Sequence, residues 1–188
     1  MNLPPHAELF LPAAMNEQSV FASVAAGWDE SGIGVAVEVS GKQHPVNGTA
    51  ADLRNSDSVS LWIDTRPSGQ VHRATQFCHQ FTCLPVDELN DDQPSVIVRE
   101  IAQQRDQRVA PNTDLFLTRT VIADHGYRLE IWIPGSQLNG FREISELRSL
   151  GFYCVIHDTE LGTQPLSLGD DFPVAYDPST WLRLELSE

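Results

Sequence analysis

Two tryptophans lie in β-strand patterns at positions that normally carry a polar side chain. In 58–64 the apolar residues alternate, and Trp62 falls between them on the other face of the strand. Trp132 holds the same place within 127–133. A flat indole presents its π face to the C–H side of a pyranose ring, so this placement predicts a platform for a neutral ligand such as a sugar. The alternative is that both sheet faces are covered and the tryptophans fill a second core layer.

Four polar side chains are candidates to complete one ligand-binding sheet face with the two tryptophans. Glu130 shares the outward parity of Trp132 on the same strand. Arg73 offers a bidentate hydrogen-bonding arm for a carboxylate or a pair of hydroxyls. His79 lies between two phenylalanines on one side of its strand, so it also fits a buried core histidine. His157, in a later strand, is the last candidate.

Carboxylates occur at the expected strand ends and turns, where oxygen ligands suit calcium. Asp64 and Asp158 are the predicted metal ligands, and calcium is the only cofactor that the pattern suggests. The alternative is that these carboxylates cap turns, because no EF-hand spacing is present. Further acidic residues of the same kind are Asp29, Glu160, Asp170, Asp171 and Asp177.

Nucleophilic catalysis lacks a local signature, since no G-x-S-x-G motif occurs. Cys78 and His79 are adjacent on one strand, so their side chains point apart. We therefore expect no enzymatic activity. A metal-dependent enzyme is kept as an alternative, built on His72, His79, His157 and Asp158, although His72 and His79 have opposite parities on a regular strand.

The elements that position these residues are short alternating runs bounded by turn residues. Asp124-His125-Gly126 is a hairpin signal, because glycine accepts a positive φ. Only 136–138 and 144–150 suggest helical turns. About nine strands in all indicate an all-β fold, an antiparallel two-sheet β-sandwich of jelly-roll type, in one domain over 1–188. We expect an N-terminal extension over 1–19 and an acidic loop over 85–94. The clearest strands are 33–39, 58–64, 71–84, 95–102, 115–123, 127–133, 151–158 and 181–186.

The composition limits the classes of binding partner that we expect. The 188 residues include 26 acidic and 12 basic side chains, and the net charge of −14 repels phosphate backbones and anionic lipids. We therefore expect no nucleic-acid or membrane partner, whereas a neutral sugar is indifferent to this field. No signal-peptide pattern or spanning stretch is seen, and the three cysteines lack a paired spacing, so a reducing cytoplasm is expected. The oligomeric state stays open.

Four segments in order carry a resemblance to a known family. They are Trp28-Asp29-Glu30-Ser31-Gly32-Ile33, Asp57-Ser58-Val59-Ser60-Leu61-Trp62-Ile63-Asp64, Gly126-Tyr127-Arg128-Leu129-Glu130-Ile131-Trp132-Ile133-Pro134, and 150–158. Together they resemble the family 9 carbohydrate-binding modules and the wider DOMON-like β-sandwich group. The histidine-containing stretch 72–81 and the ending 172–181 are similar to an uncharacterised planctomycete-type bacterial subgroup.

This resemblance implies a two-sheet jelly roll, often with bound calcium, and a sugar held between aromatic rings. The preferred hypothesis is thus a non-catalytic carbohydrate-binding-like module. An interaction or structural β-sandwich that docks a partner chain on its exposed face is the other alternative, besides the metal-dependent enzyme.

Overall fold

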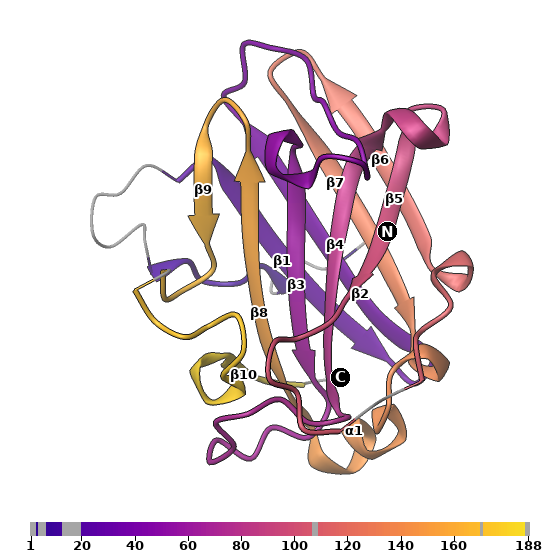
Figure 1. The fold of residues 1–188 in the computed structure, drawn as a ribbon, viewed down its shortest axis with the longest axis vertical. Coiled ribbons are helices and arrows are strands. Elements are labelled where there is room, and N and C mark those ends of the chain that lie inside the picture. Colours follow the sequence, from indigo (N-terminus) through magenta and orange to yellow (C-terminus); the bar gives the residue numbers. More distant parts are fainter. Residues whose placement is uncertain (1–2, 4–6, 13–19, 107–108, 170, 187–188) are drawn as a thin grey trace.

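The computed structural model describes residues 3, 7–12, 20–106, 109–169 and 171–186 (Figure 1). Its strands are β1 (Ala22–Asp29), β2 (Gly32–Ser40), β3 (Ser58–Asp64), β4 (Cys78–Asp87), β5 (Gln93–Arg99), β6 (Leu117–Ala123), β7 (Gly126–Pro134), β8 (Ser149–Asp158), β9 (Gly162–Pro165) and β10 (Leu182–Glu185). The helical elements are α1 (Phe141–Leu147) and the 3-10 turns η3 (Leu53–Asn55), η4 (Glu88–Asn90), η5 (Thr113–Leu115), η6 (Gly135–Gln137) and η7 (Pro178–Thr180).

The strands form two antiparallel sheets that face each other. One sheet has four strands in the order β1-β2-β7-β6, and the other has six, in the order β10-β8-β3-β4-β5 with β9 paired to β8. In Figure 1 the six-stranded sheet lies in front of the four-stranded one. The predicted all-β two-sheet sandwich is confirmed. No helix within the described residues could cross a membrane.

Strand alternation builds the core between the sheets. In the four-stranded sheet Val35 on β2 is paired with Ile131 on β7, and in the six-stranded sheet Leu61 on β3 is paired with Phe81 on β4. All four side chains are fully buried. Because side chains alternate along a strand, the residues between these core positions point outward from the two sheets. The outer faces are therefore where an exposed site could form.

Three segment boundaries differ from the predicted ones. The strand predicted over 71–84 begins only at Cys78, because residues 65–77 form a loop that Thr65 closes by donating its backbone N–H to the carbonyl of Phe77. The acidic loop predicted over 85–94 is shorter, since β4 continues through Asp87 and β5 begins at Gln93. Pro85 interrupts β4 without ending it, and a register shift lies between Leu84 and Asp87.

The sequence patterns also missed β1. Its outward positions carry Ser23, Ala25 and Gly27, so the contrast between its two faces is weak. Of the predicted extension over 1–19, Glu8 forms an isolated antiparallel bridge with Ala25, and residues 1–2, 4–6 and 13–19 lie outside the described part of the chain.

Candidate functional site

The two tryptophans lie on different sheets. Trp62 is on β3 of the six-stranded sheet, and Trp132 is on β7 of the four-stranded sheet. Each has the parity opposite to its buried core neighbours, so the two indoles lie on opposite outer faces of the sandwich. The prediction of a single sheet face that holds both is therefore wrong, because parity gives the side of a strand but not its sheet.

Trp62 is buried rather than exposed to solvent. The side chain is 6% exposed, and its indole Nε1 donates to the carbonyl of Ala175 at 3.2 Å. Its ring lies 5.5 Å from the ring of Tyr153, whose hydroxyl donates to the carbonyl of Leu168. The chain between β9 and β10 thus lies over this part of the sheet and covers the ring. Trp62 therefore fits the alternative prediction, in which the outer face of the sheet is covered and the tryptophan fills a second core layer.

Trp132, by contrast, borders an open hollow of about 380 Å³ on the outer face of the four-stranded sheet. The indole is half-buried and packs on Gly32, where an added Cβ would come within 2.8 Å of the ring. We define the Trp132 pocket as the residues that line this hollow, which are Leu117, Thr118, Arg119, Glu130 and Trp132.

Charged side chains sit beside the indole in the Trp132 pocket. The Glu130 carboxylate accepts from Arg128 Nε at 3.1 Å, and Arg128 also pairs with Glu38 at 3.3 Å. Arg119 is directly across from Glu130 on β6. Among the described residues Arg119 has no hydrogen bond or ion pair, so its guanidinium donors are available to a ligand. The pocket therefore combines an aromatic surface with a hydrogen-bond acceptor and a set of donors.

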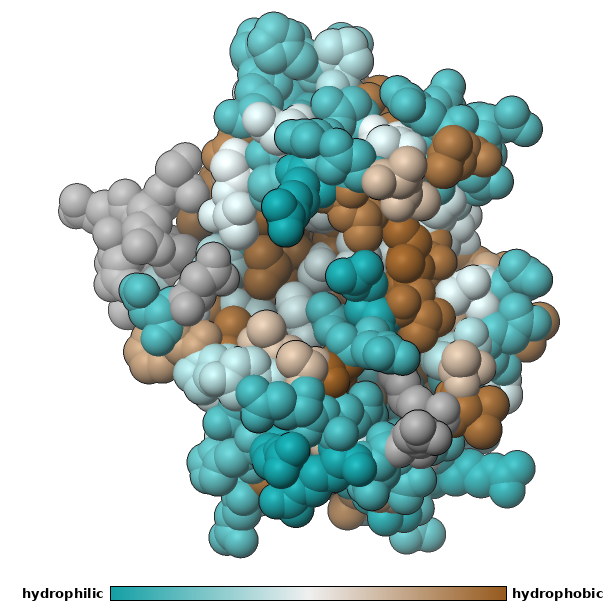
Figure 2. All heavy atoms as spheres, viewed as in Figure 1, coloured by the Kyte–Doolittle hydropathy of each residue, from teal (hydrophilic) through white to brown (hydrophobic). Residues whose placement is uncertain are grey.

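A second hollow lies on the outer face of the six-stranded sheet (Figure 2). The outward parity of β3, β4 and β8 places Ser60, Thr82, Gln80 and Val155 on this face, and the Ser60 and Thr82 hydroxyls are 3.3 Å apart. The tryptophan of this face is covered, as described above. This surface offers polar groups but has no exposed tryptophan of its own among the described residues.

The remaining predicted ligand-binding residues lie apart from the Trp132 pocket. His79 is buried on the core face of β4, where its Nε2 accepts the backbone N–H of Asn139 at 3.1 Å and its ring stacks on Phe81. Arg73 is exposed in the loop 65–77. His157 is near the end of β8, with Nδ1 3.1 Å from Thr163 Oγ1. Only Glu130 and Trp132 of the six predicted residues come together.

The predicted metal ligands Asp64 and Asp158 cannot share an ion. Antiparallel pairing of β3 with β8 puts Ser58 beside His157, so Asp64 and Asp158 lie at opposite ends of these strands, roughly 20 Å apart at ~3.3 Å per residue. No group of three or more His, Cys, Asp or Glu side chains within the described residues could hold a metal ion. Asp64 and Asp158 therefore do not belong to one common metal site, and bound calcium stays a prediction.

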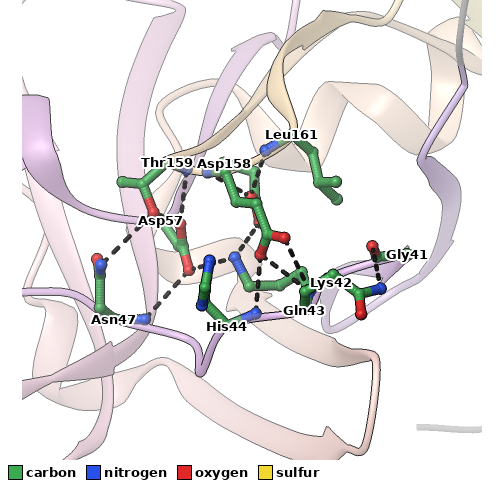
Figure 3. A network of polar contacts seen from close by, with 10 residues as sticks. Gly41, Lys42, Gln43, His44, Asn47, Asp57, Asp158, Thr159 and Leu161 are labelled. Atoms are coloured by element: carbon green, nitrogen blue, oxygen red, sulfur yellow. Dashed lines mark hydrogen bonds and ion pairs between the residues drawn. The ribbon is translucent and has the colours of Figure 1, made fainter.

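Asp158 instead belongs to a buried ion cluster that the sequence patterns missed (Figure 3). The Lys42 ammonium lies 2.7 Å from Asp158 Oδ2 and 3.1 Å from Asp57 Oδ2, and all three side chains are buried. Thr159 donates its backbone N–H and its hydroxyl to Asp57 Oδ1, both at 2.8 Å. A lone lysine after a turn glycine gives no signal for such burial, because its partners are 15 and 116 residues away.

Asp57 and Asp64 have pKa shifts of opposite sign. Burial opposes the charged form of Asp57, but hydrogen bonds from Thr159 and Lys42 outweigh it and hold the Asp57 pKa below its ordinary value. Burial raises the Asp64 pKa, although Arg66 donates its backbone N–H to Oδ1. The charged Asp57 therefore stabilises the fold above its unfolded-state pKa, whereas the charged Asp64 destabilises it above its folded-state pKa.

Two variants should reveal these opposite signs. Asp57→Asn is expected to be destabilised at about pH 7, with the deficit shrinking only below about pH 4, as the pH falls from the unfolded-state pKa through the lowered folded-state pKa of the parent. Asp64→Asn is expected to match or exceed the parent at about pH 7, and to lose that advantage at a higher pH than Asp57→Asn does, as the pH falls through the raised folded-state pKa toward about pH 4. The measurement is the free energy of urea unfolding at each pH. Parallel pH profiles for the two variants would contradict the assignment.

One serine, histidine and aspartate cluster resembles a catalytic triad in composition only. His72 Nδ1 is 3.1 Å from Asp177 Oδ2 and 3.0 Å from Ser179 Oγ, so one ring nitrogen makes both contacts. In a triad the two ring nitrogens divide these roles. The His72 side chain is 73% exposed, and Asp177 accepts the Ser179 backbone N–H at the start of η7. This arrangement is a capped turn.

No family model matches the chain, and no curated protein matches it. The fold is similar to solved structures of a family 9 carbohydrate-binding module from Caldicellulosiruptor kristjanssonii, one in complex with cellotriose and one with glucose. Each has a TM-score of 0.58 and 18% identity over 88% of this chain, covering 74% and 76% of the module respectively. At this identity the likeness establishes the fold. The DOMON-like and planctomycete-type resemblances stay predictions.

Proposed function

We propose that this protein is a non-catalytic carbohydrate-binding module whose ligand is a neutral sugar held in the Trp132 pocket. The observation that carries the proposal is the half-buried indole of Trp132 beside an open hollow that also presents Glu130 and Arg119. An indole face packs against the C–H surface of a pyranose, while a carboxylate accepts from sugar hydroxyls and a guanidinium donates to them. Such a pairing suits a polar but uncharged ligand.

The fold supports the same class of ligand. The similar family 9 modules were solved with cellotriose and with glucose, which makes these two sugars the natural first probes. The net charge of −14 disfavours anionic polymers and leaves neutral sugars unaffected. A non-catalytic role agrees with the capped-turn geometry of His72, Asp177 and Ser179 described above.

The decisive variant is Trp132→Ala. Loss of the indole is expected to weaken sugar binding by roughly tenfold or more, since aromatic stacking and its buried area contribute on the order of 1–2 kcal/mol. Calorimetric titration with cellotriose, glucose and a panel of neutral oligosaccharides measures the effect. Trp132→Phe keeps an aromatic face and serves as the matched control, with most of the affinity retained.

Two outcomes would contradict this assignment. One is the absence of binding to every sugar in the panel. The other is binding that survives Trp132→Ala and is lost in Gln80→Ala, which would move the ligand to the hollow of the six-stranded sheet.

One observation favours a partner-binding role as the second candidate. The edge strand β6 exposes Leu117, Val121 and Ile122 by 69%, 43% and 54%. An apolar edge strand can pair with an extended segment of another chain. Size-exclusion chromatography with crosslinking separates the candidates, because a complex that covers Leu117 would also close the Trp132 pocket.

A further inference from the structure

A further hollow, of about 320 Å³, lies beside the Trp132 pocket in the seam between the two sheets. The strands β5 and β6 are edge strands of different sheets, and they lie side by side along this seam (Figure 1). Thr118 on β6 lines this hollow and also the Trp132 pocket, so the two hollows lie on the two sides of one strand. We define the seam pocket as the hollow between β5 and β6, whose lining includes Asn90, Ser95, Thr113, Asp114, Phe116 and Thr118.

The seam pocket combines hydrogen-bonding groups with an aromatic side chain. Phe116 is buried and packs edge-on against Phe81, with the ring centroids 5.2 Å apart. The Ser95 hydroxyl is held on one side by a hydrogen bond to the Asp87 carboxylate, and Asp114 brings an exposed carboxylate from η5. Such oxygens accept hydrogen bonds from sugar hydroxyls. None of the described residues that line the pocket is a lysine or an arginine, so the lining suits a neutral ligand better than an anion.

The surface between the two pockets suits a chain that crosses β6. Leu117 on β6 is paired with Trp132 and is 69% exposed, so an apolar surface continues from the indole to the edge of the sheet. Within the described sheet β6 has a strand partner on one side only, so alternate residues point their N–H and C=O groups away from β7. These groups can hydrogen-bond to hydroxyls. A strand takes up about 4.8 Å in the direction of pairing, which is comparable to the length of one pyranose unit.

We propose that the ligand is a linear neutral oligosaccharide, and that the seam pocket is its second subsite. One sugar unit stacks on Trp132, the next crosses the edge of β6, and a third hydrogen-bonds to Ser95 and Asp114 in the seam pocket. This inference rests on the proposed sugar site and adds the residues that select a chain over a monosaccharide. A monosaccharide contacts the Trp132 pocket alone, whereas a chain of about three units gains the contacts on both sides of the strand.

The dependence of affinity on chain length tests the second subsite on the full protein. Calorimetric titrations use the one-, two- and three-unit members of each neutral sugar series, beginning with glucose, cellobiose and cellotriose. The parent is expected to bind the trimer roughly tenfold or more tightly than the monomer, because only the trimer reaches the seam pocket. In two-dimensional NMR spectra the trimer is expected to shift the amide signals of Ser95 and Asp114, and the monomer is expected to leave them unchanged.

Asp114→Ala separates the two subsites, because this exposed side chain lines the seam pocket and not the Trp132 pocket. The variant is expected to bind the trimer roughly fivefold to tenfold more weakly, and the monomer within about twofold of the parent. Asp114→Asn keeps an accepting oxygen and serves as the matched control, with most of the trimer affinity retained.

Two sets of results would overturn the proposal, and they are distinguishable. If monomer and trimer bind equally tightly, or if Asp114→Ala weakens both to the same extent, the second subsite is refuted while the sugar site at Trp132 stands. If no sugar of any length binds, or if binding survives Trp132→Ala, the sugar site itself is refuted and the second subsite with it.

Discussion

Lys42→Met is expected to lower the free energy of unfolding by about 3–5 kcal/mol, because it leaves two buried carboxylates without their cation. Asp57 and Asp158 both contact the Lys42 ammonium, at 3.1 and 2.7 Å, and all three side chains are buried. Methionine has a similar length and no charge, so it isolates the electrostatic loss from the loss of volume. Urea unfolding at neutral pH, followed by far-UV circular dichroism, measures the change.

An exposed ion pair provides the control for Lys42→Met. Arg183 and Glu185 pair at 3.4 Å with both side chains largely exposed, and Arg183→Met is expected to change stability by less than about 1 kcal/mol. The triple variant Lys42→Met/Asp57→Asn/Asp158→Asn should recover part of the loss, since it removes the unpaired charges together with the cation. A Lys42→Met chain as stable as the parent would show that the carboxylates are hydrated rather than buried.

Trp62→Ala is the second change with a large expected effect. Its indole is enclosed under the chain that joins β9 to β10, so truncation should cost about 3–5 kcal/mol, as for other buried aromatic residues. Removal of the indole also leaves the Ala175 carbonyl without the N–H that it accepts at 3.2 Å. Sugar affinity, measured well below the lowered Tm, should stay within about twofold of the parent.

The matched comparison is with Trp132→Ala, which should have the reverse profile: a smaller loss of stability, since Trp132 is half-buried, and a large loss of affinity. Trp62→Phe retains most of the buried area and should lose only about 1 kcal/mol with the hydrogen bond. If Trp62→Ala abolished binding while leaving stability unchanged, the ligand would lie on the six-stranded sheet and Trp62 would be part of its site.

The sequence by itself determined the strands and their faces. Alternation in 58–64 and 127–133 assigned the core side of β3 and β7 correctly, because the period-two geometry of a strand is local. The same parity correctly placed Glu130 beside Trp132. It failed for β1, where alanine and glycine reduce the contrast between the faces, and for 71–77, where a loop replaces the expected strand.

The tertiary structure alone decided which strands share a sheet, what covers each outer face and which charges meet. Trp62 and Trp132 have equivalent local patterns, yet one lies under the chain before β10 and the other borders a hollow. Lys42 finds Asp158 across 116 residues, and no local pattern marks that pairing. Strand order and long-range contacts depend on the packing of the whole chain, whereas side-chain parity depends only on the backbone of one strand.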